Sequence, residues 1–253
     1  MRQARRLAAW AWEPKQWRPP ELATDGASFP HRVYEVTIPI ARKDGAAHPL
    51  LERGKRINVA LAAPRFDGIV VSAHAPLSFW RALGRVTAAR GFVWGMELRS
   101  GCVVPALGGG ICLLSNALFE MAARLGWNIF ERHGHSLDAG QLADMDATVL
   151  WPHVDLRVAP AMGRARIDAR VVGDSLVLRV FSDTPRARSV QLRVIEGKAQ
   201  APYRSRTVIR TIDGSPEVIA RDRKRVLDAS ERTRNCLTCD ETACHARVVV
   251  GTK

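Results

Sequence analysis

Between residues 128 and 197 the sequence is a succession of short segments in which apolar and polar side chains alternate, separated by residues that favour turns. Alternation with a period of two gives a β-strand one apolar and one polar face. Strands this close in sequence pair most readily as antiparallel neighbours. We therefore expect a mainly antiparallel sheet, with strands at 31–41, 68–73, two within 95–105, and at 128–136, 146–152, 154–160, 165–183 and 189–197.

Two segments have the spacing of an amphipathic helix instead. The first begins at Leu51 and continues to Leu61, before Pro64 ends the pattern. The second covers 111–125, and its apolar positions recur at steps of three and four: Ile111, Leu114, Leu118, Met121 and Leu125. Residues 77–84 are expected to form a tight or helical turn, and the charged segment 216–235 a further helix. One or two helices packed on a mainly antiparallel sheet define an α+β fold.

The composition divides the chain into three parts. Residues 1–30 hold Trp10, Trp12 and Trp17 among basic residues and prolines, which predicts a flexible arm that either packs back on the domain or lies on a surface. Residues 31–195 contain the expected sheet and the helix after the glycines, and form the main domain. Residues 196–253 form a C-terminal extension that carries a cysteine-rich tail.

Charge and hydropathy restrict the partners and the location. Lys and Arg outnumber Asp and Glu by 38 to 25, a net charge of +13, which favours an anionic partner. The basic residues are scattered, with neither an aromatic RNA-binding motif nor a zinc-finger helix pattern, so nucleic acid is not the expected partner. No apolar run approaches the roughly 18–20 residues of a transmembrane segment. The apolar run near the N-terminus is shorter than a signal-peptide core, which predicts a cytoplasmic protein.

Three consecutive glycines, Gly108, Gly109 and Gly110, directly precede the helix that contains Cys112 in its first turn. Glycines let the backbone approach a ligand closely, and the free N–H groups at a helix start stabilise an anion. A cysteine in this position can have a pKa of roughly 3.5–7.5 instead of ~8.5. The motif therefore indicates a nucleophilic thiolate. A small buried cysteine after a tight turn is the structural alternative.

The thiol does not lie on the apolar stripe of its helix. Helical spacing places four residues on a neighbouring face, Cys112, Ser115, Asn116 and Phe119. Two of these four side chains are small and polar. We therefore expect this face to line a cleft.

The segment that follows the helix contains two histidines. If FERHGHS is a strand, Glu131, His133 and His135 lie on one side of it. Either histidine could then act as the base for the thiol, and Asp146 on the next strand could orient it, with Asp144 as the substitute. This order of thiol, histidine and carboxylate is found in thiol hydrolases and acyl transferases. A metal held by the two histidines and a structural polar cluster are the alternatives.

Four segments in order resemble the VanW family, which is associated with glycopeptide-resistance gene clusters. They are 51–85, 90–119, 131–136 and 146–158, so the resemblance covers about 51–183. The family pattern is a glycine triplet, one residue, Cys and usually Gln, a helix containing Ser, an E-R-x-x-H-S element and a D-A-T strand. This chain has Leu113 in place of the Gln and therefore lacks that side-chain amide. The resemblance implies a link with the cell wall or the glycopeptide response.

The C-terminal extension contains a second group of thiols, Cys236, Cys239 and Cys244, followed by His245. A C-x2-C pair with a third cysteine nearby suggests a zinc or iron–sulfur site, with Cys102 as a candidate fourth ligand. The spacing matches no standard motif, so thiol redox chemistry and an inert tail are the alternatives. Five cysteines, an odd number, fit a reduced compartment better than a disulfide framework.

These observations favour a cysteine-dependent hydrolase or acyl transferase that acts on a peptide or amide, with Cys112, His133, His135 and Asp146 as candidate catalytic residues. Its ligand, a peptide-like or anionic small molecule or a cell-wall precursor, is expected to contact the residues around this set: Gly108, Gly109, Gly110, Ser115, Asn116, Glu131, Arg132 and Ser136. The alternatives are a non-catalytic accessory module that binds an anionic ligand, and a zinc or iron–sulfur protein.

Overall fold

A computed structural model describes most of the chain outside its two ends. The described residues are 8, 21–23, 28–41, 49–99, 101–138, 145–186, 188–197, 200–228, 231, 236, 239 and 244. Most of the predicted N-terminal arm, including its three tryptophans, lies outside them, as does His245. No helix in the described parts is long and apolar enough to cross a membrane.

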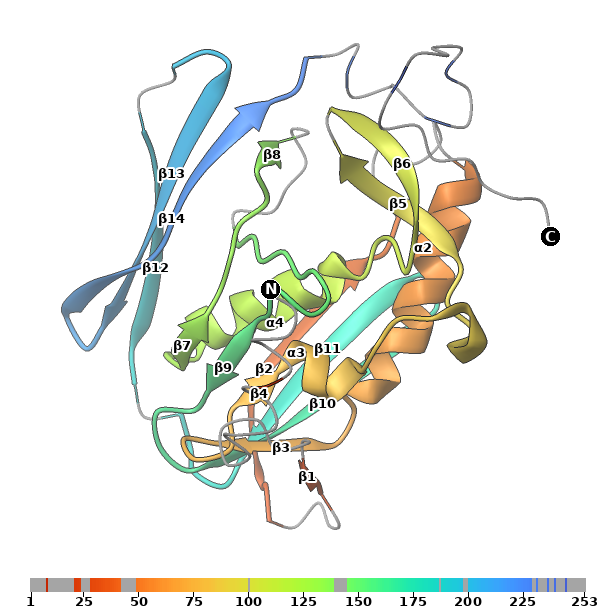
Figure 1. The fold of residues 1–253 in the computed structure, drawn as a ribbon. Coiled ribbons are helices and arrows are strands. Elements are labelled where there is room, and N and C mark those ends of the chain that lie inside the picture. The colour runs from red at the N-terminus through yellow and green to blue at the C-terminus, as the bar shows by residue number, and fades with distance from the viewer. Residues whose placement is uncertain are drawn as a thin grey trace.

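The α+β prediction is confirmed (Figure 1). The described residues form three α-helices and four small sheets, and two short 3-10 helices, η2 (Ala63–Arg65) and η3 (Ala88–Arg90). The helices are α2 (Pro49–Ala62), α3 (Phe79–Leu83) and α4 (Cys112–Arg124). They match the segments expected to be helical at 51–61 and 111–125 and the expected turn at 77–84. Every strand pairing is antiparallel except that of β8 (Leu137–Asp138) with β14 (Ser215–Val226).

The largest sheet has five strands in the order β1 (Glu21–Leu22), β3 (Ile69–Ser72), β10 (Arg164–Val172), β11 (Ser175–Ser182) and β2 (His31–Pro39). Its inner face and α4 share one hydrophobic core, in which Leu118 and Met121 of the helix and Ile167 and Leu178 of the sheet are fully buried. Each such side chain contributes about 1.5–3 kcal/mol by its removal from water. The apolar face predicted for the helix is therefore the face that anchors it.

A second sheet has the order β12 (Val190–Glu196), β13 (Tyr203–Ile212), β14 (Ser215–Val226) and β8 (Leu137–Asp138). A third consists of β4 (Leu77–Ser78), β9 (Arg157–Ala159) and β7 (Asn128–Glu131), and β5 (Trp94–Arg99) pairs with β6 (Cys102–Leu107) in the predicted hairpin. The expected domain boundary after residue 195 falls at the end of β12, whose partner β13 lies beyond it. The two expected parts thus share one sheet.

Three local predictions are wrong. The segment expected as a helix over 216–235 forms β14 as far as Val226, because its charged residues alternate between two faces rather than following a helical period. Residues 132–135 leave the strand that ends at Glu131, and 146–149 form an extended connection with no ladder of their own. In these last two segments side chains, rather than a neighbouring strand, satisfy much of the backbone.

The glycine triplet lies where the loop after β6 crosses β5 at close range. A Cβ atom on Gly109 would lie 2.4 Å from the carbonyl carbon of Gly95, and one on Gly95 would lie 2.3 Å from the Gly109 oxygen. Asn58 of α2 joins the same layer, since its side-chain amide donates to the carbonyls of Val93 and Gly109 at 3.0 Å each. This packing is the reason for glycine at position 109, and it fixes the loop that leads into α4.

Candidate functional site

Cys112 is the first residue of α4 and is half-buried. The next two backbone amides are already bonded, because Leu113 donates to the carbonyl of Gly110 at 3.2 Å and Leu114 to that of Ile111 at 2.9 Å. Within the described parts of the chain, no group accepts the backbone N–H of Cys112. Of these first amides, the N–H of Cys112 itself is therefore the one left without a bond to a described residue at the start of the helix.

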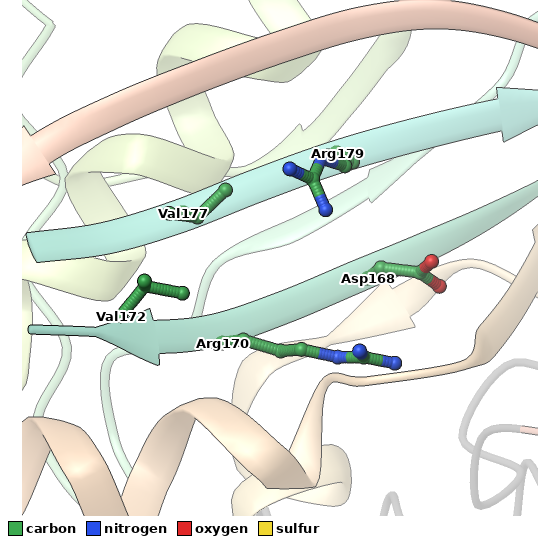
Figure 2. A pocket seen from close by; sticks show the side chains of 5 residues that line it. All are labelled: Asp168, Arg170, Val172, Val177 and Arg179. Carbon is green, nitrogen blue, oxygen red and sulfur yellow. The ribbon is translucent and has the colours of Figure 1, made fainter.

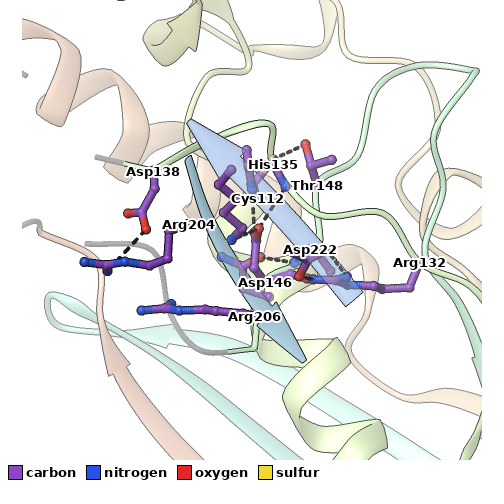
Figure 3. A network of polar contacts seen from close by, with 12 residues as sticks. Cys112, Arg132, His135, Asp138, Asp146, Thr148, Arg204, Arg206 and Asp222 are labelled. Carbon is purple, nitrogen blue, oxygen red and sulfur yellow. Dashed lines mark hydrogen bonds and ion pairs between the residues drawn. The ribbon is translucent and has the colours of Figure 1, made fainter. Parts of the chain in front are cut away.

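The thiol of Cys112, the ring of His135 and the carboxylate of Asp146 lie next to one another (Figure 3). The imidazole Nδ1 of His135 lies 2.5 Å from Oδ1 of Asp146, and the backbone N–H of His135 donates to Oδ2 of the same carboxylate at 2.8 Å. The ring also lies close enough to the thiol of Cys112 for the two groups to shift each other's pKa. Because Nδ1 is engaged by the carboxylate, Nε2 is the ring nitrogen left for the thiol. We call Cys112, His135 and Asp146 the Cys112 site.

The three groups shift one another's protonation in a consistent direction. Burial raises the pKa of the Cys112 thiol, but the hydrogen bond and positive charge of His135 outweigh this, so the pKa is lowered overall. Burial lowers the pKa of His135, and the bonds to Asp146 and Cys112 outweigh it and raise this pKa to about 10. The pKa of Asp146 is well below its usual range: burial raises it, but His135, followed by Lys224, lowers it by more. The shifts therefore favour the ionised forms of all three groups: a thiolate at Cys112, an imidazolium at His135 and a carboxylate at Asp146.

The polar face of α4 holds the segment that carries Asp146. The hydroxyl of Ser115 donates to the carbonyl of Ala147 at 2.6 Å, and the side-chain oxygen of Asn116 accepts the N–H of Ala147 at 2.7 Å. The hydroxyl oxygen of Thr148 lies 3.9 Å from the sulfur of Cys112. Ser115 and Asn116, which were predicted to line a cleft, thus fix the backbone next to the Asp146 carboxylate.

Two residues of β14 support the site and were not identified from the sequence. Lys224 forms an ion pair with Oδ2 of Asp146, and both side chains are almost completely buried. Asp222 accepts two hydrogen bonds of 2.6 Å from the guanidinium of Arg132, whose Nε donates to the carbonyl of Asp146 at 2.5 Å (Figure 3). These residues belong to the run RDRKRV, in which a period of two is the signal for two faces of a strand.

The two histidines have different surroundings. The side chain of His133 is 52% exposed and lies 3.6 Å from Glu131, whereas that of His135 is 25% exposed and faces Asp146. They do not share a strand face, because the strand ends before them. Glu131 accepts the backbone N–H of Asp155 at 3.1 Å, and the carbonyl of Ser136 accepts the N–H of Arg225. Of the two candidate bases, the geometry brings His135 to the thiol.

The ligand contacts expected of the glycine triplet, and of the other residues around the site, stay predictions. Gly108 and Gly110 have φ of 76° and 95°, values that favour glycine, and a Cβ on Gly110 would lie 2.3 Å from Cγ of Lys55. The positive φ values and the close packing of Gly110 against α2 are therefore sufficient to explain the residue type here. A ligand is not needed for that explanation.

The C-terminal thiols are half-buried at Cys236, Cys239 and Cys244. The backbone N–H of Cys236 donates to the carbonyl of Val103 at 3.1 Å, which brings this thiol-bearing residue to the strand that begins at Cys102. Among the residues that the structure describes, no three or more His, Cys, Asp or Glu residues are grouped to hold a metal ion. The predicted zinc or iron–sulfur site, which includes His245, stays a prediction.

A shallow depression lies elsewhere, on the outer face of the β10–β11 hairpin (Figure 2). It is lined by Asp168, Arg170, Val172, Val177 and Arg179. These positions alternate along the strands with the fully buried residues that face α4. The depression is therefore on the side of the sheet that faces away from Cys112.

Comparison with known proteins agrees with the resemblance found in the sequence. The family model described as "VanW like protein" matches residues 54–181. The vancomycin B-type resistance protein VanW of Enterococcus faecalis is 23% identical over 137 residues, which are 52% of this chain and 50% of that protein. The uncharacterized protein YoaR of Bacillus subtilis is 29% identical over 127 residues, 49% of this chain and 42% of the relative. The chain thus spans about half the length of these curated relatives or less, and no solved structure matches it significantly.

Proposed function

The chain belongs to the VanW family, which is associated with vancomycin resistance, and from this premise we propose that it is a cysteine-dependent acyl transferase or hydrolase acting on a peptide or amide. The observation that carries the proposal is the juxtaposition of the Cys112 thiol with His135, whose Nδ1 lies 2.5 Å from the buried carboxylate of Asp146. Nucleophile, base and orienting carboxylate in this order are the elements of acyl transfer by a thiol.

In the first half-reaction the thiolate of Cys112 attacks the carbonyl carbon of the substrate amide. The backbone N–H of Cys112 stabilises the oxyanion that forms, and Leu113 adds no side-chain amide to this role. The imidazolium of His135 then gives its proton to the leaving nitrogen as the C–N bond breaks. The products of this step are a free amine and a thioester at Cys112.

In the second half-reaction, His135 is neutral and removes a proton from the acceptor. If the acceptor is water, attack on the thioester gives a carboxylic acid; if it is an amine, attack gives a new amide. In both cases the thiolate leaves and the imidazolium is restored, so the enzyme returns to its starting state. Asp146 stays ionised throughout and keeps Nδ1 of His135 protonated, which directs Nε2 to the reacting atoms.

The substrate class follows from the family and from the charge of the chain. A family associated with vancomycin resistance suggests the peptide of a cell-wall precursor, which provides amide bonds and carboxylates. A net charge of +13 favours an anionic molecule of this kind over a cationic one. Hydrolysis and transfer share the same thioester, and their products distinguish them.

The test is to incubate the protein with synthetic cell-wall stem peptides, with and without an added amine, and to follow both the products and the intact protein mass. We expect an acyl adduct on Cys112, with hydrolysed peptide or amine-exchanged peptide as product. Cys112→Ala should abolish both, and Cys102→Ala is the matched control that should retain them. Full activity of Cys112→Ala, or a folded wild-type protein that yields neither adduct nor product, would contradict the proposal.

A further inference from the structure

Lys224 lies outside the segment matched by the family model, yet its ammonium group reaches the centre of the Cys112 site. We infer that Lys224 is a positioning residue for Cys112: its buried positive charge holds the Asp146 carboxylate against His135 and so keeps the thiol activated. The inference rests on the proposed role of Cys112 as nucleophile. It adds that the β12–β13–β14 sheet supplies part of the catalytic apparatus.

The geometry of Asp146 supports this role. Its side chain is fully buried and has two distinct tasks, since Oδ1 bonds to Nδ1 of His135, whereas Oδ2 accepts from the backbone of His135 and from Lys224. Three donors on two oxygens fix the rotation of the carboxylate. Of these three donors, Oδ2 would keep only the backbone N–H of His135 if Lys224 were removed.

The position of Lys224 on β14 makes the contact specific. Successive side chains of a strand point to opposite faces, and here Asp222 and Lys224 face the site, whereas Arg221 and Arg223 are exposed on the other face. The same strand also bonds to the chain after His135, because the N–H of Arg225 donates to the carbonyl of Ser136 at 2.9 Å. A single strand thus holds both the segment of the histidine and the carboxylate.

Charge balance gives Lys224 a role beyond packing. When Cys112 is ionised, the charges of the thiolate, the imidazolium, the Asp146 carboxylate and the ammonium of Lys224 sum to zero. Of the neighbouring charges, Arg132 and Asp222 pair with each other. Farther along, Asp138 of β8 lies 3.7 Å from Arg204 of β13. Removal of Lys224 leaves one negative charge in excess, which disfavours a second anion, the thiolate.

Stability alone is a weak reason for a buried lysine, because a buried ion pair often contributes no more than an apolar pair of the same volume. A lysine that serves only packing could therefore be replaced without any effect on the thiol. A lysine that tunes the site could not. The titration of Cys112 distinguishes these two cases without requiring a substrate.

The experiment measures the rate of Cys112 alkylation by iodoacetamide against pH, with the modified peptide identified by mass spectrometry. The full chain is compared with Lys224→Met, Lys224→Gln and Lys224→Arg. The matched control is Arg221→Met, which removes the same charge from the exposed face of the same strand. We expect the midpoint pH of the alkylation profile to rise by about one unit in Lys224→Met and Lys224→Gln, provided that these variants have the wild-type circular dichroism spectrum. This rise corresponds to a tenfold loss of alkylation rate on the acid side of the profile. The charge-conserving Lys224→Arg variant should keep the midpoint close to that of the wild type, and Arg221→Met should show no shift.

An unchanged midpoint in a folded Met or Gln variant would overturn the inference. Failure of both neutral variants to fold would also overturn it, because Lys224 would then be a residue required for stability. A different result would contradict the proposed function: a wild-type Cys112 that titrates at low pH but forms no acyl adduct with any stem peptide. The alkylation profile therefore tests the role of Lys224, and the adduct measurement tests the proposed function.

Discussion

The Cys112 site and the outer face of the β10–β11 hairpin both hold opposite charges close together, but in different surroundings. Asp146 and Lys224 have side chains that are 0% and 3% exposed. On the outer face, the pair of Arg170 with Asp67 is 63% and 28% exposed. Water competes for the second pair and screens it, whereas the first pair has only protein partners.

This contrast shows which polar residues of a strongly basic chain carry information about function. The exposed pairs contribute little to stability and keep the surface hydrated. The buried pair is costly to assemble, and it is oriented toward a thiol whose protonation it can influence. A depression with two arginines is therefore a weaker functional candidate than a small set of buried groups that converge on one sulfur atom.

The largest effect should come from Asp146→Asn, which keeps the volume of the side chain and removes its charge. Lys224 then stays buried without a counter-charge, so we expect the free energy of unfolding to fall by about 3–5 kcal/mol. Urea denaturation followed by circular dichroism measures this. The control is Asp174→Asn, at an exposed turn residue that pairs with Arg56. This change should alter the free energy of unfolding by less than about 1 kcal/mol. Equal effects at both positions would remove the distinction between the two regions.

An intermediate effect is expected for His135→Gln, which deletes the imidazolium beside the thiol. Only the hydrogen bonds from Val149 and Thr148 then offset the effect of burial on Cys112, so its pKa should rise and its alkylation rate at pH 7 should fall by about tenfold or more. In the wild-type protein the rate should decline only in acid, and activity should also decline near pH 10 as His135 loses its proton. His133→Gln is the control. An equally large fall in the alkylation rate of His133→Gln would contradict the assignment of His135 as the base.

The smallest effect should come from Arg170→Met on the outer face. Its partner Asp67 stays hydrated, so the free energy of unfolding should change by no more than about 0–1 kcal/mol, and less at high salt. The alkylation profile of Cys112 should be unchanged. Thermal unfolding at two salt concentrations, together with that profile, tests both statements. A change in thiol reactivity would connect the two faces of the sheet and weaken the comparison.

Regular patterns made much of the fold predictable. The helix that begins at Cys112 and the β5–β6 hairpin have a clear period and clear turn residues, and both form where expected. The elements of the candidate site were predictable because Cys112 follows a glycine turn and Asp146 precedes an alternating segment. The sequence did not distinguish His133 from His135 as the base. Both histidines were assumed to lie on one strand, but that strand ends at Glu131.

Lys224 and Asp222 could not be assigned to the site from the sequence for a physical reason. A run of charged residues looks the same whether its strand is solvated on both faces or buried on one, and only the packing of one face of β14 against Arg132 and Asp146 decides this. Ala220 and Val226 continue the inward face on either side of the two charged residues. That weak period of two is the available signal, and it competes with a helical interpretation of the same segment.

The parallel contact between β8 and β14 has a consequence for the order in which the protein matures. Asp146 and Lys224 are 78 residues apart, and Arg132 and Asp222 are 90 apart. At about 5–20 residues per second, a ribosome needs about 4–16 s to extend the chain from the first member of the former pair to the second. During that interval the thiol and the histidine exist without the strand that holds them. Full thiol reactivity is therefore acquired late in synthesis, when the last strand of the sheet docks.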